Sequence, residues 1–156
     1  MRIVVPLAAL ALLVGCSGSG STDGGLPDSG VVDCTSDPRV ATYAPNLAVM
    51  DPAGNRQYVL VQSSPAPPAR GNDTWTVKVL DSSGAPVSDL DLSAAAFMPD
   101  HGHGSSVVPT VTSNGDGTYS VTPLYFFMPG VWRVTLSDAD GGSSATSGVW
   151  FFCVEG

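Results

Sequence analysis

Short apolar segments alternate with turn-forming clusters along the chain from Tyr43 onward. In residues 75–79 (Trp-Thr-Val-Lys-Val) and 132–136 (Trp-Arg-Val-Thr-Leu), large apolar side chains occupy every second position and so share one face of an extended strand. Clusters rich in Asp, Asn, Gly and Pro separate such segments. This pattern predicts an all-β fold, an immunoglobulin-like antiparallel β-sandwich of about seven strands. The expected strands cover approximately residues 56–62, 75–79, 90–98, 107–112, 118–127, 132–136 and 149–154.

The first 15 residues differ in composition from the rest of the chain. Arg2 precedes an apolar run of about 12 residues, which is typical of a secretory signal and too short for a bilayer, which requires about 20. The run ends in Leu-Val-Gly-Cys at residues 13–16, which resembles the bacterial lipobox, where the chain is cut before a lipidated cysteine. We therefore expect a lipoprotein signal peptide at 1–15 and a lipid on Cys16. The alternative is an ordinary signal cut nearby.

Three regions follow from this interpretation. After Cys16, residues 16–33 are rich in Gly and Ser and are expected to form a flexible linker. Residues 34–156 are expected to form the single folded domain, since a chain of 156 residues has room for one.

The charge balance limits the possible partners. The chain has 6 Lys and Arg against 14 Asp and Glu, for a net charge of −8, and Lys78 is its single lysine. No basic stripe is available to neutralise phosphates, so nucleic acid is not expected as a partner.

Two cysteines remain once Cys16 is assigned to lipid. Cys34 and Cys153 lie at the two ends of the expected domain, and export would place them in an oxidising compartment. We therefore predict a disulfide between them. The competing interpretation is that both thiols bind metal, although neither lies in a Cys-x-x-Cys spacing.

The candidate chemistry lies in residues 98–104 (Met-Pro-Asp-His-Gly-His-Gly), which contain the two histidines of the sequence. In an extended segment, residues two apart point the same way, so His101 and His103 can face one ion. Antiparallel connectivity brings Met98 and Met128 to the same end of the sandwich. Imidazole suits copper or zinc, and thioether sulfur favours Cu(I). The predicted copper ligands are Met98, His101, His103 and Met128.

Each of these residues also has a structural explanation. Met98 and Met128 are in phase with neighbouring apolar residues, so both also fit as core. Histidines in loops are often simply solvated. Asp100 fits a turn-forming residue better than a ligand, and Trp132 fits the core.

No catalytic arrangement emerges from the same loop. Asp100, His101, His103 and Ser105 lie too close together in sequence for a catalytic triad, and no Gly-x-Ser-x-Gly elbow occurs. We therefore expect that the protein is not an enzyme.

Several motifs together resemble the YtkA-like domain, which is related to FixH. The resemblance spans about residues 56–154, and its most specific elements are the Met-Pro-x-His-x-His-Gly loop at 98–104 and the Met-Pro-Gly-x-Trp turn at 128–132. It implies an immunoglobulin-like sandwich of the bacterial envelope. It also implies a role in copper handling or in the assembly of copper-containing respiratory oxidases, with the two histidines and two methionines as ligands. FixH is anchored by a transmembrane helix, whereas this chain carries a lipobox. The remaining motifs of the resemblance lie at 67–72, 75–79, 81–86 and 117–119.

Two function classes follow. The first is a lipid-anchored protein at the periplasmic or outer-membrane face that binds copper as a metallochaperone, buffer or sensor. Its partner would be another copper protein or a respiratory oxidase assembly. The alternative is a structural or protein-interaction sandwich of the cell envelope without metal.

We expect the mature protein to fractionate with membranes, because several acyl chains on Cys16 exceed the single chain that gives only marginal binding. Cys16→Ser should leave the protein soluble or uncleaved, as measured by fractionation and mass spectrometry. Cys34→Ser, which also removes one thiol, should keep the lipid. Recovery of the wild-type protein in the soluble periplasmic fraction would contradict the assignment.

Overall fold

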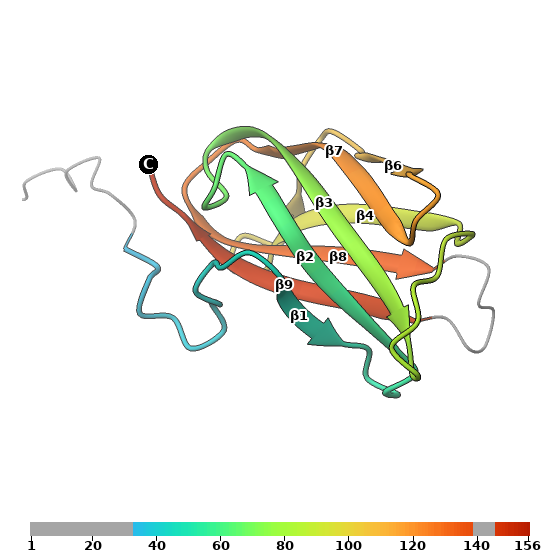
Figure 1. Ribbon diagram of the computed structural model, residues 1–156. Helices are drawn as coiled ribbons and strands as arrows, with labels where there is room; N and C mark the ends of the chain where they lie inside the picture. The colour runs from blue at the N-terminus through green and yellow to red at the C-terminus, as the bar shows by residue number, and fades with distance from the viewer. Residues whose placement is uncertain (1–32, 139–145) are drawn as a thin grey trace, which may run out of the picture.

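The computed structural model describes residues 33–138 and 146–156, which form two antiparallel β-sheets (Figure 1). The all-β sandwich is confirmed, with nine strands in the described residues instead of about seven. Across these residues no helix is long and apolar enough to span a membrane. The strands are β1 (Leu47–Met50), β2 (Arg56–Ser64), β3 (Gly71–Asp81), β4 (Leu92–Met98), β5 (His103–Gly104), β6 (Thr110–Ser113), β7 (Thr118–Phe126), β8 (Gly130–Asp138) and β9 (Ser147–Val154).

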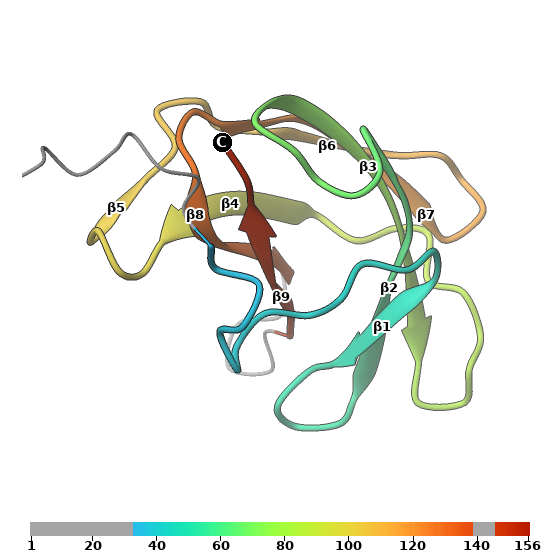
Figure 2. The ribbon, with the colours of Figure 1, turned by 90° about the vertical axis from the view of Figure 1, so that its left-hand side faces the viewer.

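The strands divide into a first sheet with the order β1-β2-β3-β7-β6 and a second sheet with the order β5-β4-β8-β9. The chain passes from one sheet to the other between β7 and β8, through residues 127–129. Figure 2 shows β5 and the turn before it projecting from the end of β4. The segments around Met98 and Met128 therefore lie at one end of the sandwich, as the connectivity predicted.

Three tryptophans fill the space between the sheets. Trp75 in β3, Trp132 in β8 and Trp150 in β9 are almost completely buried. The Trp75 ring meets Trp150 edge to face at 5.8 Å and Phe152 at 5.5 Å, so one side chain of the first sheet contacts two of the second. The alternation seen in the sequence thus places its large apolar residues on the inner faces.

The structure differs from the expected strands in three places. β1 was not predicted, and neither was β5, whose His103 had been expected in a loop. The strand expected at 107–112 begins at Thr110, because Pro109 cannot donate to a ladder and Val108 is exposed.

The predicted disulfide is confirmed. Cys34 and Cys153 are bonded, with their Cα atoms 5.3 Å apart. The bond attaches the segment before β1 to β9, the edge strand of the second sheet. The signal peptide, Cys16 and all of the linker except residue 33 lie outside the described residues.

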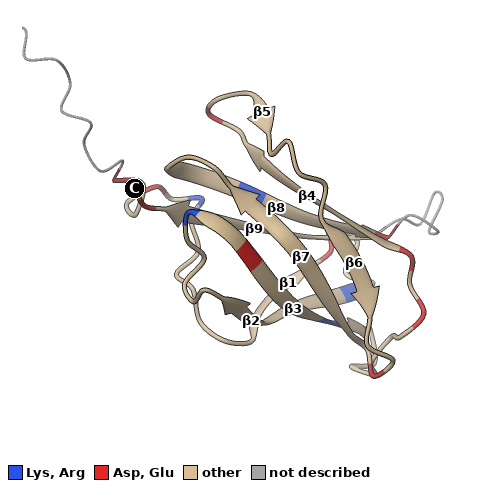
Figure 3. Cartoon of the chain, turned by 90° about the horizontal axis from the view of Figure 1, so that it is seen from above, with Lys and Arg blue, Asp and Glu red and all other residues tan. Residues whose placement is uncertain are grey.

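Charged side chains are few and lie mostly in the turns and loops at the strand ends (Figure 3). Over the described residues, Lys and Arg are scattered and do not form a continuous patch.

Asp73 is an exception, because this carboxyl is buried at the start of β3. The Ala69 N–H donates to its Oδ2 at 3.3 Å, whereas Oδ1, Ser63 Oγ and Trp75 Nε1 have no hydrogen-bond partner. Burial raises the pKa of Asp73 to about 7, against the weaker opposing effect of the hydrogen bond from Ala69.

Loss of the disulfide should destabilise the domain. Cys153→Ser is expected to lower the free energy of unfolding by about 2–5 kcal/mol, since the bond constrains most of the unfolded chain. Chemical denaturation of the oxidised protein measures the change. Cys34→Ser should lower the free energy of unfolding by a similar amount. The double variant Cys34→Ser/Cys153→Ser should lower it little further, because each single variant already lacks the disulfide. Additive losses would contradict this explanation.

The buried carboxyl should make stability depend on pH. The folded protein binds the Asp73 proton more tightly than the unfolded chain, in which the pKa is about 4. The contribution of this group to the free energy of unfolding therefore falls as pH rises from about 4 to about 7.

Asp73→Asn should remove this contribution and raise the Tm at pH 8 by several degrees. Thermal unfolding between pH 4 and pH 8 measures the effect. Asp116→Asn is the control, because hydrogen bonds from Thr118 lower the pKa of that exposed carboxyl. It should reduce the Tm at neutral pH instead. An unchanged pH profile in Asp73→Asn would contradict the assignment.

Candidate metal site at one end of the sandwich

The histidines are held by a tight turn at the end of β4. The carbonyl of Met98 accepts hydrogen bonds from the N–H groups of His101 at 3.3 Å and Gly102 at 3.0 Å. Gly102 has φ of +69°, a conformation that side chains disfavour, and it reverses the chain toward β5. The turn and β5 thus place both histidines beside the last residue of β4.

His103 is part of a strand and not of a loop, which corrects the expectation. It pairs with Met98 across β4 and β5, so the two side chains lie on the same face of the second sheet. Its ring is half-buried and stacks on Phe127 at 5.5 Å with an interplanar angle of 27°. Packing therefore orients this imidazole.

His101 is exposed, and its ring centre lies 5.6 Å from that of His103. Two imidazoles that share one ion have nitrogens about 2.0–2.1 Å from it, which places their ring centres at most roughly 6.5 Å apart. The separation in the structure fits this limit. The ring separation is therefore compatible with two imidazoles that share one ion.

Met98 is completely buried and belongs to the hydrophobic core. Its Cε lies 2.7 Å from the position that a Cβ on Gly130 would occupy, so the glycine provides the space for the methionine. The structure thus supports the core explanation for Met98 and also places it beside His103.

Met128 lies at the same end, half-buried against the core. Its carbonyl accepts a hydrogen bond from Trp132 Nε1 at 2.9 Å, and the preceding residue, Phe127, stacks on His103. Trp132 is fully buried and packs edge to face on Phe127 at 5.4 Å, in agreement with a core role. From the β2–β3 loop, Arg70 Nε donates to the Phe127 carbonyl at 3.2 Å.

Within the described residues, no three His, Cys, Asp or Glu side chains lie close enough together to hold a metal ion. The potential soft donors at this end are two imidazoles and two methionine sulfurs, and that of Met98 belongs to a completely buried side chain. That donor set suits copper, and Cu(I) in particular.

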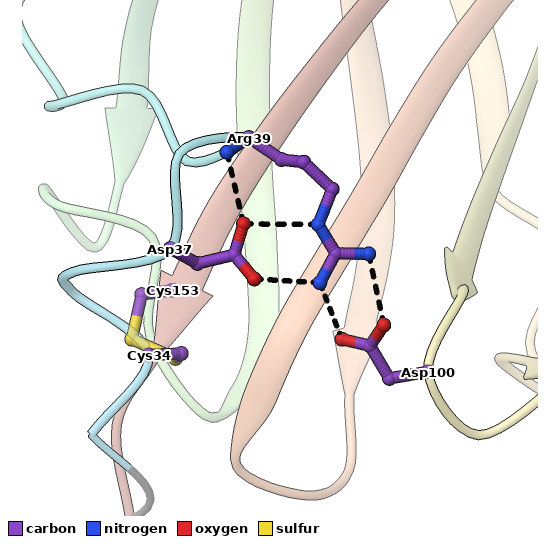
Figure 4. A network of polar contacts seen from close by, with 5 residues as sticks. All are labelled: Cys34, Asp37, Arg39, Asp100 and Cys153. Atoms are coloured by element: carbon purple, nitrogen blue, oxygen red, sulfur yellow. Dashed lines mark hydrogen bonds and ion pairs between the residues drawn. A yellow bond between two sulfur atoms is a disulfide. The ribbon is translucent and has the colours of Figure 1, made fainter.

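An ion-pair network joins the histidine turn to the segment before β1 (Figure 4). Arg39 donates to both oxygens of Asp100, at 2.8 and 2.7 Å, and to both oxygens of Asp37, at 2.9 and 2.6 Å. These hydrogen bonds lower the pKa of Asp100 and bring that of Asp37 to about 2. Sequence reasoning missed the contact, because Arg39 and Asp100 are 61 positions apart.

A cavity of about 350 Å³ lies beside this network. His101 and the carboxylates of Asp33, Asp37 and Asp100 line it, together with Cys34. The exposed histidine thus faces an acidic depression next to the disulfide.

A family model described as YtkA-like matches residues 53–137. The chain belongs to the YtkA-like family. The match includes the histidine turn and the turn that leads into β8, so this part of the resemblance is confirmed. Membership suggests a cell-envelope protein. No curated protein and no solved structure matches the chain.

Three features of this YtkA-like protein lie outside the matched segment. Cys34 and Arg39 precede it, and Cys153 follows it. The disulfide and the guanidinium that contacts the histidine turn are thus supplied by the flanks of the chain.

Proposed function

We propose that this protein is a lipid-anchored copper-binding protein of the bacterial cell envelope that acts as a metallochaperone, buffer or sensor. His101 and His103 would hold the ion, with thioether sulfur from Met98 and Met128. The observation that carries this proposal is the pair of imidazoles 5.6 Å apart beside a buried methionine.

The surroundings favour copper over harder ions. His103 lies between Met98 and the Phe127 ring, a site that is apolar on its inner side. Soft sulfur and imidazole donors in apolar surroundings suit Cu(I), whereas magnesium and calcium require oxygen donors.

A binding role is favoured over catalysis. The carboxylate nearest in sequence to His101 is that of Asp100, and Arg39 hydrogen-bonds to both of its oxygens. It is therefore not placed to act as a base or to orient an imidazole. We propose that the protein is not an enzyme.

The exposed position of His101 fits the transfer of copper to a partner. The turn that carries it projects from the end of the sandwich, where a second protein can reach the ion (Figure 2). We propose another copper protein or a respiratory oxidase assembly as that partner. The lipid on Cys16 would keep both at the membrane.

One observation favours the alternative, a protein-interaction module without metal. A cavity of about 620 Å³ lies between the segment around Tyr43 and the proline-rich β2–β3 loop, with Phe152 and Cys153 in its wall. The metal experiment below separates the two functions.

The purified domain should bind one copper ion per chain. His101→Ala/His103→Ala should abolish tight binding, because both nitrogen donors are lost, and lowering the pH should weaken wild-type binding because protons compete for imidazole. Competition with a Cu(I) chelator gives the affinity, and circular dichroism checks the fold, since His103 packs on Phe127. Equal binding by wild type and the double variant would leave the interaction module as the function.

Methionine variants test the sulfur donors. Met98→Leu and Met128→Leu keep the apolar volume and should weaken Cu(I) while leaving Cu(II) nearly unchanged. Met50→Leu is the matched control, because Met50 is 52% exposed and lies in β1, away from the histidines. If all three variants bind Cu(I) like the wild type, the methionines serve only in packing.

A further inference from the structure

We propose that Arg39 determines the metal selectivity of the histidine site by keeping the Asp100 carboxylate away from the bound ion. This inference rests on the proposed function, because it concerns the same two histidines. It assigns a role to a residue outside the segment that defines the family.

Arg39 binds both oxygens of Asp100. Its two terminal nitrogens donate to the two oxygens of that carboxylate at 2.8 and 2.7 Å, and its Nε and one terminal nitrogen bind Asp37 in the same way (Figure 4). The planar guanidinium matches a carboxylate in this two-point geometry, which lysine cannot reproduce. Each oxygen of Asp100 thus accepts a charge-assisted hydrogen bond from Arg39.

With its oxygens on Arg39, Asp100 does not form a three-ligand group with the two histidines, but it is the carboxylate adjacent to His101 in sequence. It precedes His101 directly, and the two side chains line the same acidic cavity. A free carboxylate beside two imidazoles gives a nitrogen and oxygen donor set that suits Zn²⁺, a common metal for such sites. With Arg39 in place, the donors that remain are imidazole and thioether, which favour Cu(I).

Arg39 is itself fixed by the backbone around it. Cys34 is bonded to β9, the Asp37 N–H donates to the Cys34 carbonyl at 3.2 Å, and the Ala41 N–H donates to Phe151 of β9 at 2.9 Å. The arginine therefore lies between two attachments to the same strand. An isolated surface ion pair contributes little to stability, but these contacts form a two-carboxylate network on a restrained segment.

The test compares Zn²⁺ and Cu(I) affinities, measured by chelator competition on the oxidised protein. Arg39→Ala should bind Zn²⁺ about tenfold more tightly than wild type, a change of about 1.4 kcal/mol in binding free energy, because the freed Asp100 carboxylate adds an oxygen ligand. Its Cu(I) affinity should change less. Adding Asp100→Asn to Arg39→Ala should abolish the zinc gain, because the amide is a much poorer ligand.

Two further variants separate charge from hydrogen bonding. Arg56→Ala removes an equal charge and also breaks an ion pair, with Asp138, at the opposite end of the sandwich. It should leave both affinities unchanged. Arg39→Lys keeps the positive charge at the site but loses the two-point contact with Asp100. It should therefore show part of the increase in zinc affinity. The same variant tests the proposal if Arg39→Ala fails to fold.

The outcomes are distinguishable. Unchanged zinc affinity in Arg39→Ala and Arg39→Lys, equal loss of both metals, or a zinc gain that persists with Asp100→Asn would overturn the role of Arg39. Two of these outcomes, the unchanged zinc affinity and the persistent zinc gain, are measured with zinc alone. Failure of the wild type to bind Cu(I) would therefore count against the proposed function alone.

Discussion

The contact of Trp75 with Trp150 and Phe152 holds the two sheets together, and the arrangement at the histidine end depends on it. Because the sheets pack face to face, the chain can pass from β7 to β8 in a three-residue turn. That turn contains Phe127 and places its ring on His103 of the second sheet. The imidazole is therefore positioned by the same packing that forms the core.

Local patterns in the sequence were sufficient to predict those parts of the fold that depend on the alternation of apolar and polar residues along a strand. Trp75 and Trp132 point inward as their spacing predicted, and two cysteines at the ends of the domain left one sensible pairing. Antiparallel connectivity also placed Met98 and Met128 at one end. These inferences succeed because strand periodicity and short turns leave few topologies open.

The remaining features depend on contacts between residues distant in sequence. Nothing near Arg39 shows that it contacts Asp100, and a two-residue strand such as β5 carries no periodicity. The burial of Asp73 was missed for a different reason: this residue lies two positions before Trp75, outside the strand expected at 75–79, although it shares the buried face of β3 with Trp75. Such features require the register of the sheets, which a single sequence does not supply.

The position of Asp33 has a consequence for how the preceding part of the chain joins the domain. Asp33 and Cys34 share a cavity wall with His101, so the described part of the chain begins beside the histidine turn. Whatever precedes residue 33 therefore joins the domain at the end that carries the histidines, and not at the opposite end, where Arg56 pairs with Asp138.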